Sequence, residues 1–380
     1  MGDVGIEQFR SEARRWIGER QSADPDLFVQ PVASLEDAWP HHRALQRALF
    51  DAGLSRRGWP EGAGGLGGST TLRAVLYDEL WATGYVPEGF QTLEIIGPML
   101  CRYAGEIASQ HLAAFIAGDE VWCQGFSEPN AGSDMAAIRA RAVPDGDGWR
   151  LSGQKIWTSL VSVATHCLVL ARTGTIEERH RGLSMFVVPL ASPGIEARPI
   201  EAISGRNEFG EVFFDDVAVP REALIGDIGA GWALAMYLLQ WERGGYAWLR
   251  QGLVHRRVSA ALSARGGLAH PALARAWSAA GVLRCRSMST LRALAEGVDL
   301  GPAISVDKLL LSRTEQFAYD VLREMAAGDF ELDAGDAAEQ LREEWFYTRA
   351  ASIYGGTAEI QRTIVADRLL GLPKEPVARG

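Results

Sequence analysis

The 380-residue chain lacks the segments that would place it in a membrane or export it. No apolar run is long enough to cross a bilayer, and the N-terminus has no charged stretch followed by an apolar one. Acidic residues also outnumber basic ones, 48 to 38. The net charge of -10 disfavours a nucleic-acid partner, because binding phosphates requires a basic surface. We therefore expect a cytoplasmic protein that binds neither membranes nor nucleic acids.

Cysteine is scarce, and its spacing excludes two kinds of site. The four cysteines are far apart in the sequence and form no Cys-x-x-Cys pair, at Cys101, Cys123, Cys167 and Cys285. They predict neither a disulfide framework nor a zinc site, which fits a reducing cytosol. His41 and His42 are adjacent and the other histidines are scattered, so we predict no metal site.

The first part of the chain has the apolar periodicity of helices, from about Glu7 to Gly118. It begins with a stripe at helical spacing, formed by Ile6, Phe9, Ala13 and Ile17. A second helix is predicted from about Leu35. The loop 58–68 is rich in glycine and has the texture of a dinucleotide-binding loop. No strand precedes this loop, so a structural role is favoured.

The middle of the chain has the composition of strands. Four short runs with β-branched and aromatic residues are separated by turns, at residues 166–173, 183–190, 194–200 and 211–220. They predict a small antiparallel barrel or sandwich. Helical periodicity returns from Gly229 and ends in a helix that Thr357 caps and Gly371 closes. These helices predict a bundle of the sort that also mediates oligomers.

One stretch has the residues of a cofactor site. In the segment 127–134, Gly132 lets the backbone approach a ligand closely, and N–H groups beside Ser133 suit a phosphate. A predicted β-hairpin follows, with Asp145-Gly146 in its loop. Trp157, at the end of the second arm, offers a flat apolar face of the size of a flavin or a base. On composition alone, the same residues are more typical of an ordinary turn cluster before a strand.

The amino-acid sequence of this stretch resembles the flavin-binding core of the acyl-CoA dehydrogenase family. The family signature is a Ser/Thr-Glu-Pro-x-Ala-Gly-Ser-Asp block followed by Gly-x-Lys-x-Trp, matched here by residues 127–134 and 153–157. A second family signature is matched at residues 354–362. The resemblance spans the whole chain. It implies the acyl-CoA dehydrogenase-like fold: an α-helical N-terminal domain (1–120), a middle antiparallel β-barrel domain that binds flavin (121–228), and a C-terminal domain like a four-helix bundle (229–380).

The chemistry that the resemblance implies is FAD-dependent α,β-dehydrogenation of an acyl-CoA or acyl-carrier thioester, within lipid metabolism. Many family members carry the catalytic base directly after the tyrosine of the C-terminal signature, where this chain has Gly355. Others carry it on the long helix before an arginine, which Glu242-Arg243 matches. Glu242 is therefore predicted to be the base, with Gly244-Gly245 leaving room beside its carboxylate. The alternative is a solvated helix glutamate paired with an arginine.

The other site residues are carried over by position. The predicted flavin contacts are Gln124, Phe126, Ser127, Gly132, Ser133, Trp157, Ser159, Thr357 and Glu359. Tyr354, Gly355 and Arg243 are predicted to lie beside the thioester.

The resemblance also implies partners. Electrons would pass to an electron-transferring flavoprotein. Two segments through which many members reach a neighbouring subunit's flavin match poorly here, at residues 264–271 and 322–328. Either a homo-oligomer (dimer or tetramer) or a heteromer with a related subunit is thus expected. Two other functions stay open: a flavin-dependent monooxygenase on the same fold, and a subunit that completes a partner's flavin site.

Overall fold

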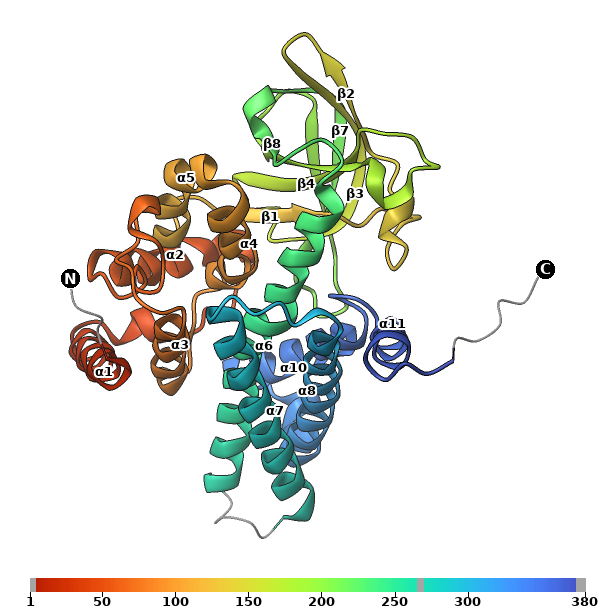
Figure 1. Ribbon diagram of the computed structural model, residues 1–380. Coiled ribbons are helices and arrows are strands. Elements are labelled where there is room, and N and C mark those ends of the chain that lie inside the picture. Colours follow the sequence, from red (N-terminus) through yellow and green to blue (C-terminus); the bar gives the residue numbers. More distant parts are fainter. Residues whose placement is uncertain (1–4, 265–269, 374–380) are drawn as a thin grey trace. The chain divides into compact units, whose positions relative to one another are not determined.

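The computed structural model describes residues 5–264 and 270–373, and its elements follow the predicted order of helices, strands and helices (Figure 1). The chain forms two compact units that divide between Leu239 and Gln240, inside helix α6. Because this division falls within a helix, the three domain ranges stay predictions. Across the described ranges, no helix combines the length and the apolar character needed to cross a membrane.

The first unit begins with the predicted helices. They are α1 (Ile6–Ala23), α2 (Leu35–Asp51), α3 (Thr71–Thr83), α4 (Gly89–Tyr103) and α5 (Gly105–Ala117). Helix α1 buries Phe9, Ala13 and Ile17 of the predicted stripe. Ile6 is exposed instead, because it is the first residue of the helix.

The glycine-rich loop 58–68 packs around a buried tryptophan. The Arg73 guanidinium lies 3.7 Å from the centroid of the Trp59 ring and pairs with the buried Glu94 carboxylate at 2.9 Å. Tyr77 donates a hydrogen bond to the same carboxylate at 2.6 Å. A Cβ atom at Gly65 would lie only 2.1 Å from the Trp59 carbonyl oxygen, so the loop closes on Trp59 only with glycine there. The contacts support the predicted structural role.

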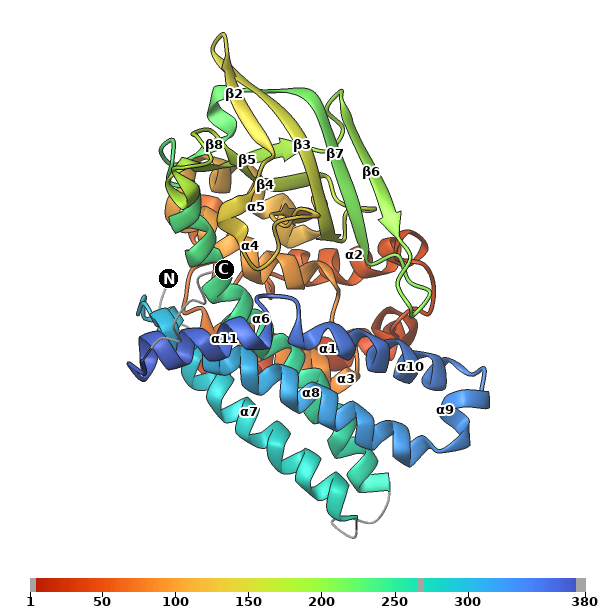
Figure 2. The same cartoon turned by 90° about the vertical axis from the view of Figure 1, so that its right-hand side faces the viewer.

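The strands form one mixed sheet. They are β1 (Trp122–Gly125), β2 (Arg141–Asp145), β3 (Gly148–Ser159), β4 (His166–Arg172), β5 (Leu183–Pro189), β6 (Ile195–Ile200), β7 (Phe209–Val219) and β8 (Leu224–Ile225). The order is β6-β7-β3-β2-β4-β5-β8, with β1 beside β4, and Figure 2 shows β6, β7, β3 and β2 side by side. The hairpin β2–β3 and the four predicted strands are confirmed. The pairing is antiparallel as predicted, except that β1 and β2 each pair with β4 in parallel.

Side chains from most of these strands meet in one apolar cluster, which includes Leu151, Val169, Phe186 and Val212. A single cluster filled from so many strands is what a curved, barrel-like sheet produces. The parallel pairing of β1 with β4 also places Cys123 opposite Cys167. Both thiols are free and fully buried, and burial raises the pKa of Cys123.

The second unit is a helical bundle. Helix α6 (Gly231–Ala264) enters it from the first unit, and α7 (Pro271–Ala295), α8 (Ser305–Ala326), α9 (Gly328–Leu332), α10 (Asp336–Arg349) and α11 (Ala358–Ile364) follow. Buried residues of α6, α7 and α8 form its core, and Leu341 and Trp345 of α10 pack against it. Thr357 caps α11 as predicted, because its Oγ1 accepts from the Ile360 amide at 3.3 Å.

Candidate functional site

The Glu and Lys of the first signature form a buried ion pair. The Glu128 carboxylate accepts from Lys155 Nζ at 2.8 Å, and from the backbone amides of Arg139 at 2.7 Å and Ala140 at 2.8 Å. Burial lowers the pKa of Lys155, and the charge of Glu128 opposes that shift. Lys155 also donates to the Phe126 carbonyl at 3.2 Å. These two residues therefore hold the loop in place, a role that the motif alone did not reveal.

The same scaffold brings the two halves of the signature together. The Ile156 amide donates to the Ser127 carbonyl at 3.0 Å, which ties the loop to the end of β3. Among the predicted flavin contacts, Phe126 is buried, whereas Gln124, Ser127 and Ser159 are half-buried. Gly132 and Ser133 are exposed on the loop. The predicted contacts of the first unit thus combine buried anchors with accessible groups.

Trp157 stands out because its backbone is strained and its large aromatic side chain is exposed. The register of β3 against β7 shifts between Lys155 and Thr158, and Trp157 has a φ of 59° at this irregularity. A left-handed backbone costs a non-glycine residue about 1–2 kcal/mol. The side chain is 58% exposed, and the adjacent Thr158 hydroxyl is buried without a hydrogen-bond partner in the described residues. Strain, exposure and an unsatisfied polar atom together indicate a binding surface.

In the second unit, Glu242 of α6 lies against Gly355. Gly355 has a φ of 63°, and a Cβ atom there would lie 2.7 Å from Glu242 Oε1. Arg243 Nε donates to the Gly355 carbonyl at 3.2 Å. Burial lowers the pKa of Arg243, although the charge of Glu242 raises it. The predicted residues Glu242, Arg243 and Gly355 are therefore brought together, from segments more than a hundred positions apart.

One detail of this region differs from the sequence interpretation. A Cβ atom at Gly244 would lie 2.8 Å from Leu294 Cδ1 and 3.1 Å from Thr290 Cγ2. Gly244 therefore permits close packing of α7 on α6, instead of leaving room beside Glu242. The bond from Arg243 Nε to the Gly355 carbonyl places the guanidinium beside this turn, and its role beside the thioester stays a prediction.

Tyr354 is clamped by charged residues that the sequence did not single out. Its hydroxyl donates to Glu315 Oε2 at 3.3 Å, and Arg250 Nε donates to Glu315 Oε1 at 2.6 Å. Lys308 Nζ lies 3.5 Å from the centroid of the Tyr354 ring. Lys308 and Glu315 are seven residues apart on α8 and share one face of the helix. The sequence feature that could have indicated this site is a pair of oppositely charged residues, Lys308 and Glu315, on the buried side of one helix.

The last helix supplies weaker support for its predicted contacts. Glu359 is exposed and pairs with Arg362 at 3.2 Å. Gln361 is fully buried, and neither its Nε2 nor its Oε1 has a hydrogen-bond partner in the described part of the chain. Of the two predicted interface segments, residues 265–269 lie outside the described residues. The segment 322–328 forms the end of α8 and the start of α9.

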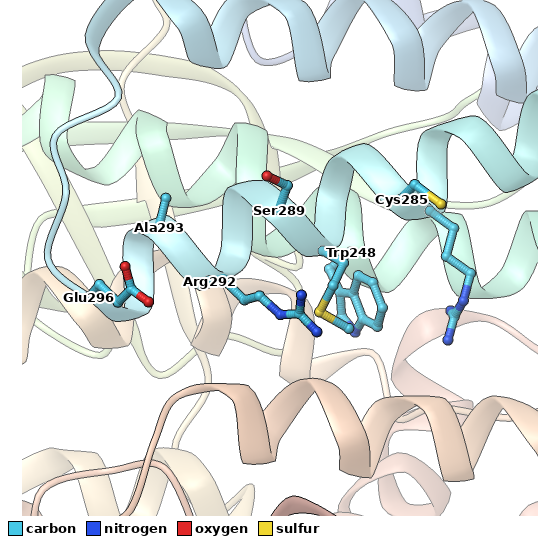
Figure 3. A pocket seen from close by; sticks show the side chains of 8 residues that line it. Trp248, Cys285, Ser289, Arg292, Ala293 and Glu296 are labelled. Carbon is cyan, nitrogen blue, oxygen red and sulfur yellow. The ribbon is translucent and has the colours of Figure 1, made fainter.

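A separate cavity of about 650 Å³ opens along α6 and α7 (Figure 3). It is lined by Trp248, Arg284, Cys285, Met288, Ser289, Arg292, Ala293 and Glu296. The Arg284 guanidinium lies 4.8 Å from the centroid of the Trp248 ring. No predicted site residue lines this cavity, so it is not the predicted site.

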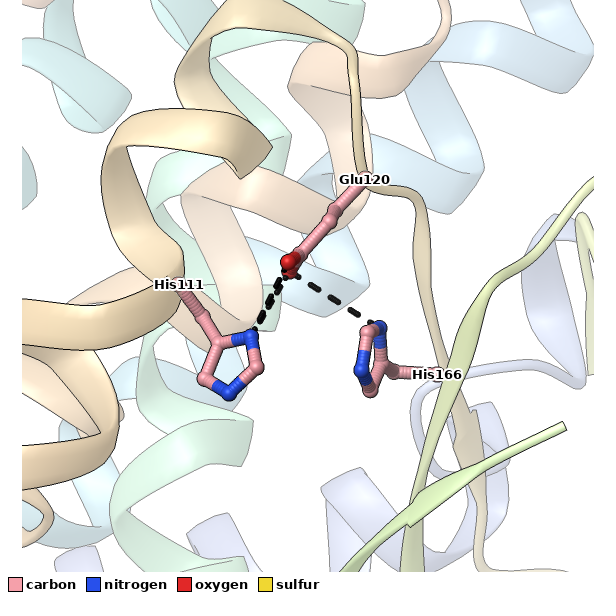
Figure 4. A group of neighbouring side chains, drawn as sticks. All are labelled: His111, Glu120 and His166. Carbon is pink, nitrogen blue, oxygen red and sulfur yellow. Dashed lines mark hydrogen bonds and ion pairs between the residues drawn. The ribbon is translucent and has the colours of Figure 1, made fainter. Parts of the chain in front are cut away.

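One polar cluster in the first unit has the donor types of a metal site (Figure 4). His111 Nδ1 lies 3.0 Å from Glu120 Oε1, and His166 Nδ1 lies 3.7 Å from Glu120 Oε2. Each group already has a protein partner, because Trp122 Nε1 donates to Glu120 Oε2 at 2.8 Å and the Thr165 hydroxyl lies 2.9 Å from His166 Nδ1. The cluster therefore holds α5 against β4, and the absence of a metal stays a prediction.

Comparisons with known proteins point to one family. Residues 123–217 match the family model described as acyl-CoA dehydrogenase, middle domain, and residues 229–370 match acyl-CoA dehydrogenase, C-terminal domain. Acyl-CoA dehydrogenase IpdE1 of Mycobacterium tuberculosis is 36% identical, over 97% of this chain and 98% of the relative. The solved Tcur3481-Tcur3483 steroid ACAD aligns with a TM-score of 0.83 and 28% identity, over 99% of both chains. The ChsE4-ChsE5 complex from Mycobacterium tuberculosis aligns with a TM-score of 0.78 and 25% identity, over 97% of this chain and 98% of that chain.

The buried pair of Glu128 and Lys155 yields the first prediction. Lys155→Met leaves the Glu128 carboxylate buried without its cation, so we expect a loss of about 3–5 kcal/mol in the free energy of unfolding. Hydrogen exchange at the Arg139 and Ala140 amides should accelerate. The control is Arg179→Met, which removes an exposed pair with Asp134 beside the same loop and should cost less than about 1 kcal/mol. Equal losses in the two variants would contradict the assignment.

Proposed function

The chain belongs to the acyl-CoA dehydrogenase family and is an oxidoreductase that acts on CH–CH bonds, and from this premise we propose that it is an FAD-dependent dehydrogenase with Glu242 as its base. Its substrate would be an acyl-CoA or acyl-carrier thioester, and its product the trans-2-enoyl thioester. In this reaction a base removes the α-proton while a hydride leaves the β-carbon. An electron-transferring flavoprotein is the proposed electron acceptor.

The observation that carries the proposal is the position of the Glu242 carboxylate. Family members place the base either after the signature tyrosine or on the long helix, and these two positions are 355 and 242 in this chain. Glu242 Oε1 lies 2.7 Å from the point where a side chain at position 355 would begin. The carboxylate of Glu242, which extends from α6, therefore lies beside the point where the side chain of a glutamate at position 355 would begin. This agreement supports Glu242 as the group that accepts the α-proton.

The residues of the chain fit a flavin. When bound, FAD would supply the acceptor for the hydride. Trp157 offers an exposed aromatic face, and the buried Thr158 hydroxyl and Gln361 amide are polar groups without a partner in the described residues. We propose that Gln124, Phe126, Ser127, Gly132, Ser133, Trp157, Ser159, Thr357 and Glu359 hold the flavin. Because the Glu359 carboxylate is exposed and paired with Arg362, its contact rests on the least support.

We also propose a substrate class and an assembly. Two solved relatives have paired names, and one of these is called a steroid ACAD. The names support a heteromer with a related subunit and a bulky, steroid-like acyl group, in keeping with the poor match of the two interface segments. One flavin per chain, with turnover by the chain purified alone, would instead favour a homo-oligomer.

Replacing Glu242 tests the proposed base. With a panel of acyl-CoA thioesters that includes ring-containing ones, the anaerobic visible spectrum of the wild type should bleach with at least one member. The bleaching rate should fall by about 10²–10⁴-fold in Glu242→Gln, because a general base is lost. Glu19→Gln, on an exposed part of α1, is the control and should bleach like the wild type. Unchanged bleaching in Glu242→Gln would reject the base, and a wild type that no thioester bleaches would favour the oxygenase alternative.

The glycine at position 355 gives a second, geometric prediction. In Gly355→Ala the added methyl would press on Glu242 Oε1, so the carboxylate must move, and a displacement of about 1 Å can cost about 10²-fold in rate. The matched control is Gly371→Ala, because Gly371 has the same φ of 63° but nothing within 4 Å of its Cβ position. The rate constant of flavin reduction should fall in the first variant and stay near the wild-type value in the second. A similar loss in both would mean that backbone strain, and not the contact with Glu242, is responsible.

A further inference from the structure

We propose that Lys308 is a positioning residue for this reaction: its ammonium fixes the Tyr354-Gly355 turn beside Glu242. The inference rests on the proposed function, because the position of this turn matters for the reaction only if Glu242 accepts the α-proton.

The ammonium of Lys308 is buried in the bundle. Lys308 lies on α8 and is only 2% exposed. A buried charge is costly unless it is paired or hydrogen-bonded. Lys308 Nζ donates to the Ala351 carbonyl at 2.8 Å, just before the turn that contains Tyr354. The chain thus maintains a buried cation at a defined place, where an apolar side chain would cost less.

Tyr354 is held both at its ring and at its hydroxyl. Lys308 Nζ lies over the ring, 3.5 Å from its centroid, which is a close cation–π contact. The hydroxyl at the far end of the ring is held by Glu315, whose other oxygen is held by Arg250. Gly355 follows Tyr354 directly. Fixing the ring therefore fixes the backbone at the position that faces Glu242.

Lys308 and Glu242 lie beside the same glycine, Gly355. The Cβ position of Gly355 lies 2.7 Å from Glu242 Oε1 and 3.6 Å from Lys308 Cε, so the two side chains border the same point. Burial lowers the pKa of Lys308 to about 8, although Glu315 and Glu242 oppose the shift, and Arg243 and Arg250 add to it.

These charges fix the sign of the expected pH dependence. Lys308 is mostly protonated at pH 7 and loses its proton as the pH rises through about 8. The protonated form holds the Tyr354 ring through the cation–π contact, whereas the neutral amine does not. The pH profile of kcat/KM should therefore fall as the pH rises through about 8. A neutral residue at position 308 should lower kcat/KM and abolish this fall.

The test measures this profile from about pH 5 to about pH 9 on the full-length flavin-loaded protein, together with its partner if one is required, and with a thioester that it oxidises. Lys308→Met removes the charge and the hydrogen bond. Lys308→Gln removes the charge but keeps an N–H donor for the Ala351 carbonyl, so it decides the outcome if the first variant does not fold. Both should lower kcat/KM by about 10-fold and abolish its fall near pH 8. Lys308→Arg should keep kcat/KM near the wild-type value and should also lack the fall, because arginine stays protonated.

A control separates this role from a purely structural one. Arg286 forms an ion pair with the buried Asp307 at 2.8 Å, in the same bundle. Arg286→Met should lower the melting temperature and keep the fall of kcat/KM near pH 8. If the Lys308 variants keep this fall, whether or not they lower the melting temperature, Lys308 is structural and the inference is wrong. If Glu242→Gln keeps its activity, the proposed base fails first, and that result is distinguishable from a failure of Lys308 alone.

Discussion

The space beside Gly355 is the constraint on which the account of this molecule depends. Gly355 lies in a turn, has a left-handed backbone conformation and carries no side chain. The Glu242 carboxylate of α6 lies 2.7 Å from the position that a Cβ atom of residue 355 would take. Any larger residue at position 355 would have to displace this carboxylate. The turn is also held through its backbone, because Arg243 binds the Gly355 carbonyl. Arg243, which follows Glu242 in the sequence, and Gly355, which faces it, therefore together fix the surroundings of the Glu242 carboxylate.

Buried charges fix the position of the other functional segments as well. Glu128 and Lys155 hold the loop of the first signature, and Arg250 and Glu315 hold the ring of Tyr354. Such pairs contribute little net stability, since desolvation offsets most of their attraction. Their geometry is nevertheless specific, because each carboxylate oxygen has a defined donor. Loops that carry a binding surface gain a fixed shape from these hydrogen bonds.

Much of the fold followed from local patterns in the sequence. The strands at residues 166–173 and 183–190 were visible because β-branched residues alternate with clear turns, and the hairpin was visible because Asp145-Gly146 marks its loop. Helix α10 was not predicted, since half-buried residues with many charges leave only a weak apolar stripe. The neighbourhood of Cys123 and Cys167 depends on a parallel pairing between distant strands, which spacing along the chain does not encode.

Those residues of the candidate site that belong to a recognisable family motif could be predicted from the sequence. Glu242 could be predicted as the base because the family has two alternative positions for the base, and this chain has a glycine, Gly355, at the other one. The strained backbone of Trp157 could not be foreseen, because it arises from an irregularity in the pairing of β3 with β7. Lys308 and Glu315 were missed for a similar reason, since their roles come from contacts with Tyr354 that only the folded chain creates.

The central claim, that Glu242 removes the α-proton, is tested most directly by following that proton. The protein is incubated anaerobically in deuterated water with a thioester that it binds, and deuterium at the α-carbon is measured by mass spectrometry. The account predicts incorporation by the wild type, and none above the uncatalysed rate by Glu242→Gln, although the variant still binds the thioester. Undiminished incorporation by Glu242→Gln would contradict it and would assign the base to another residue.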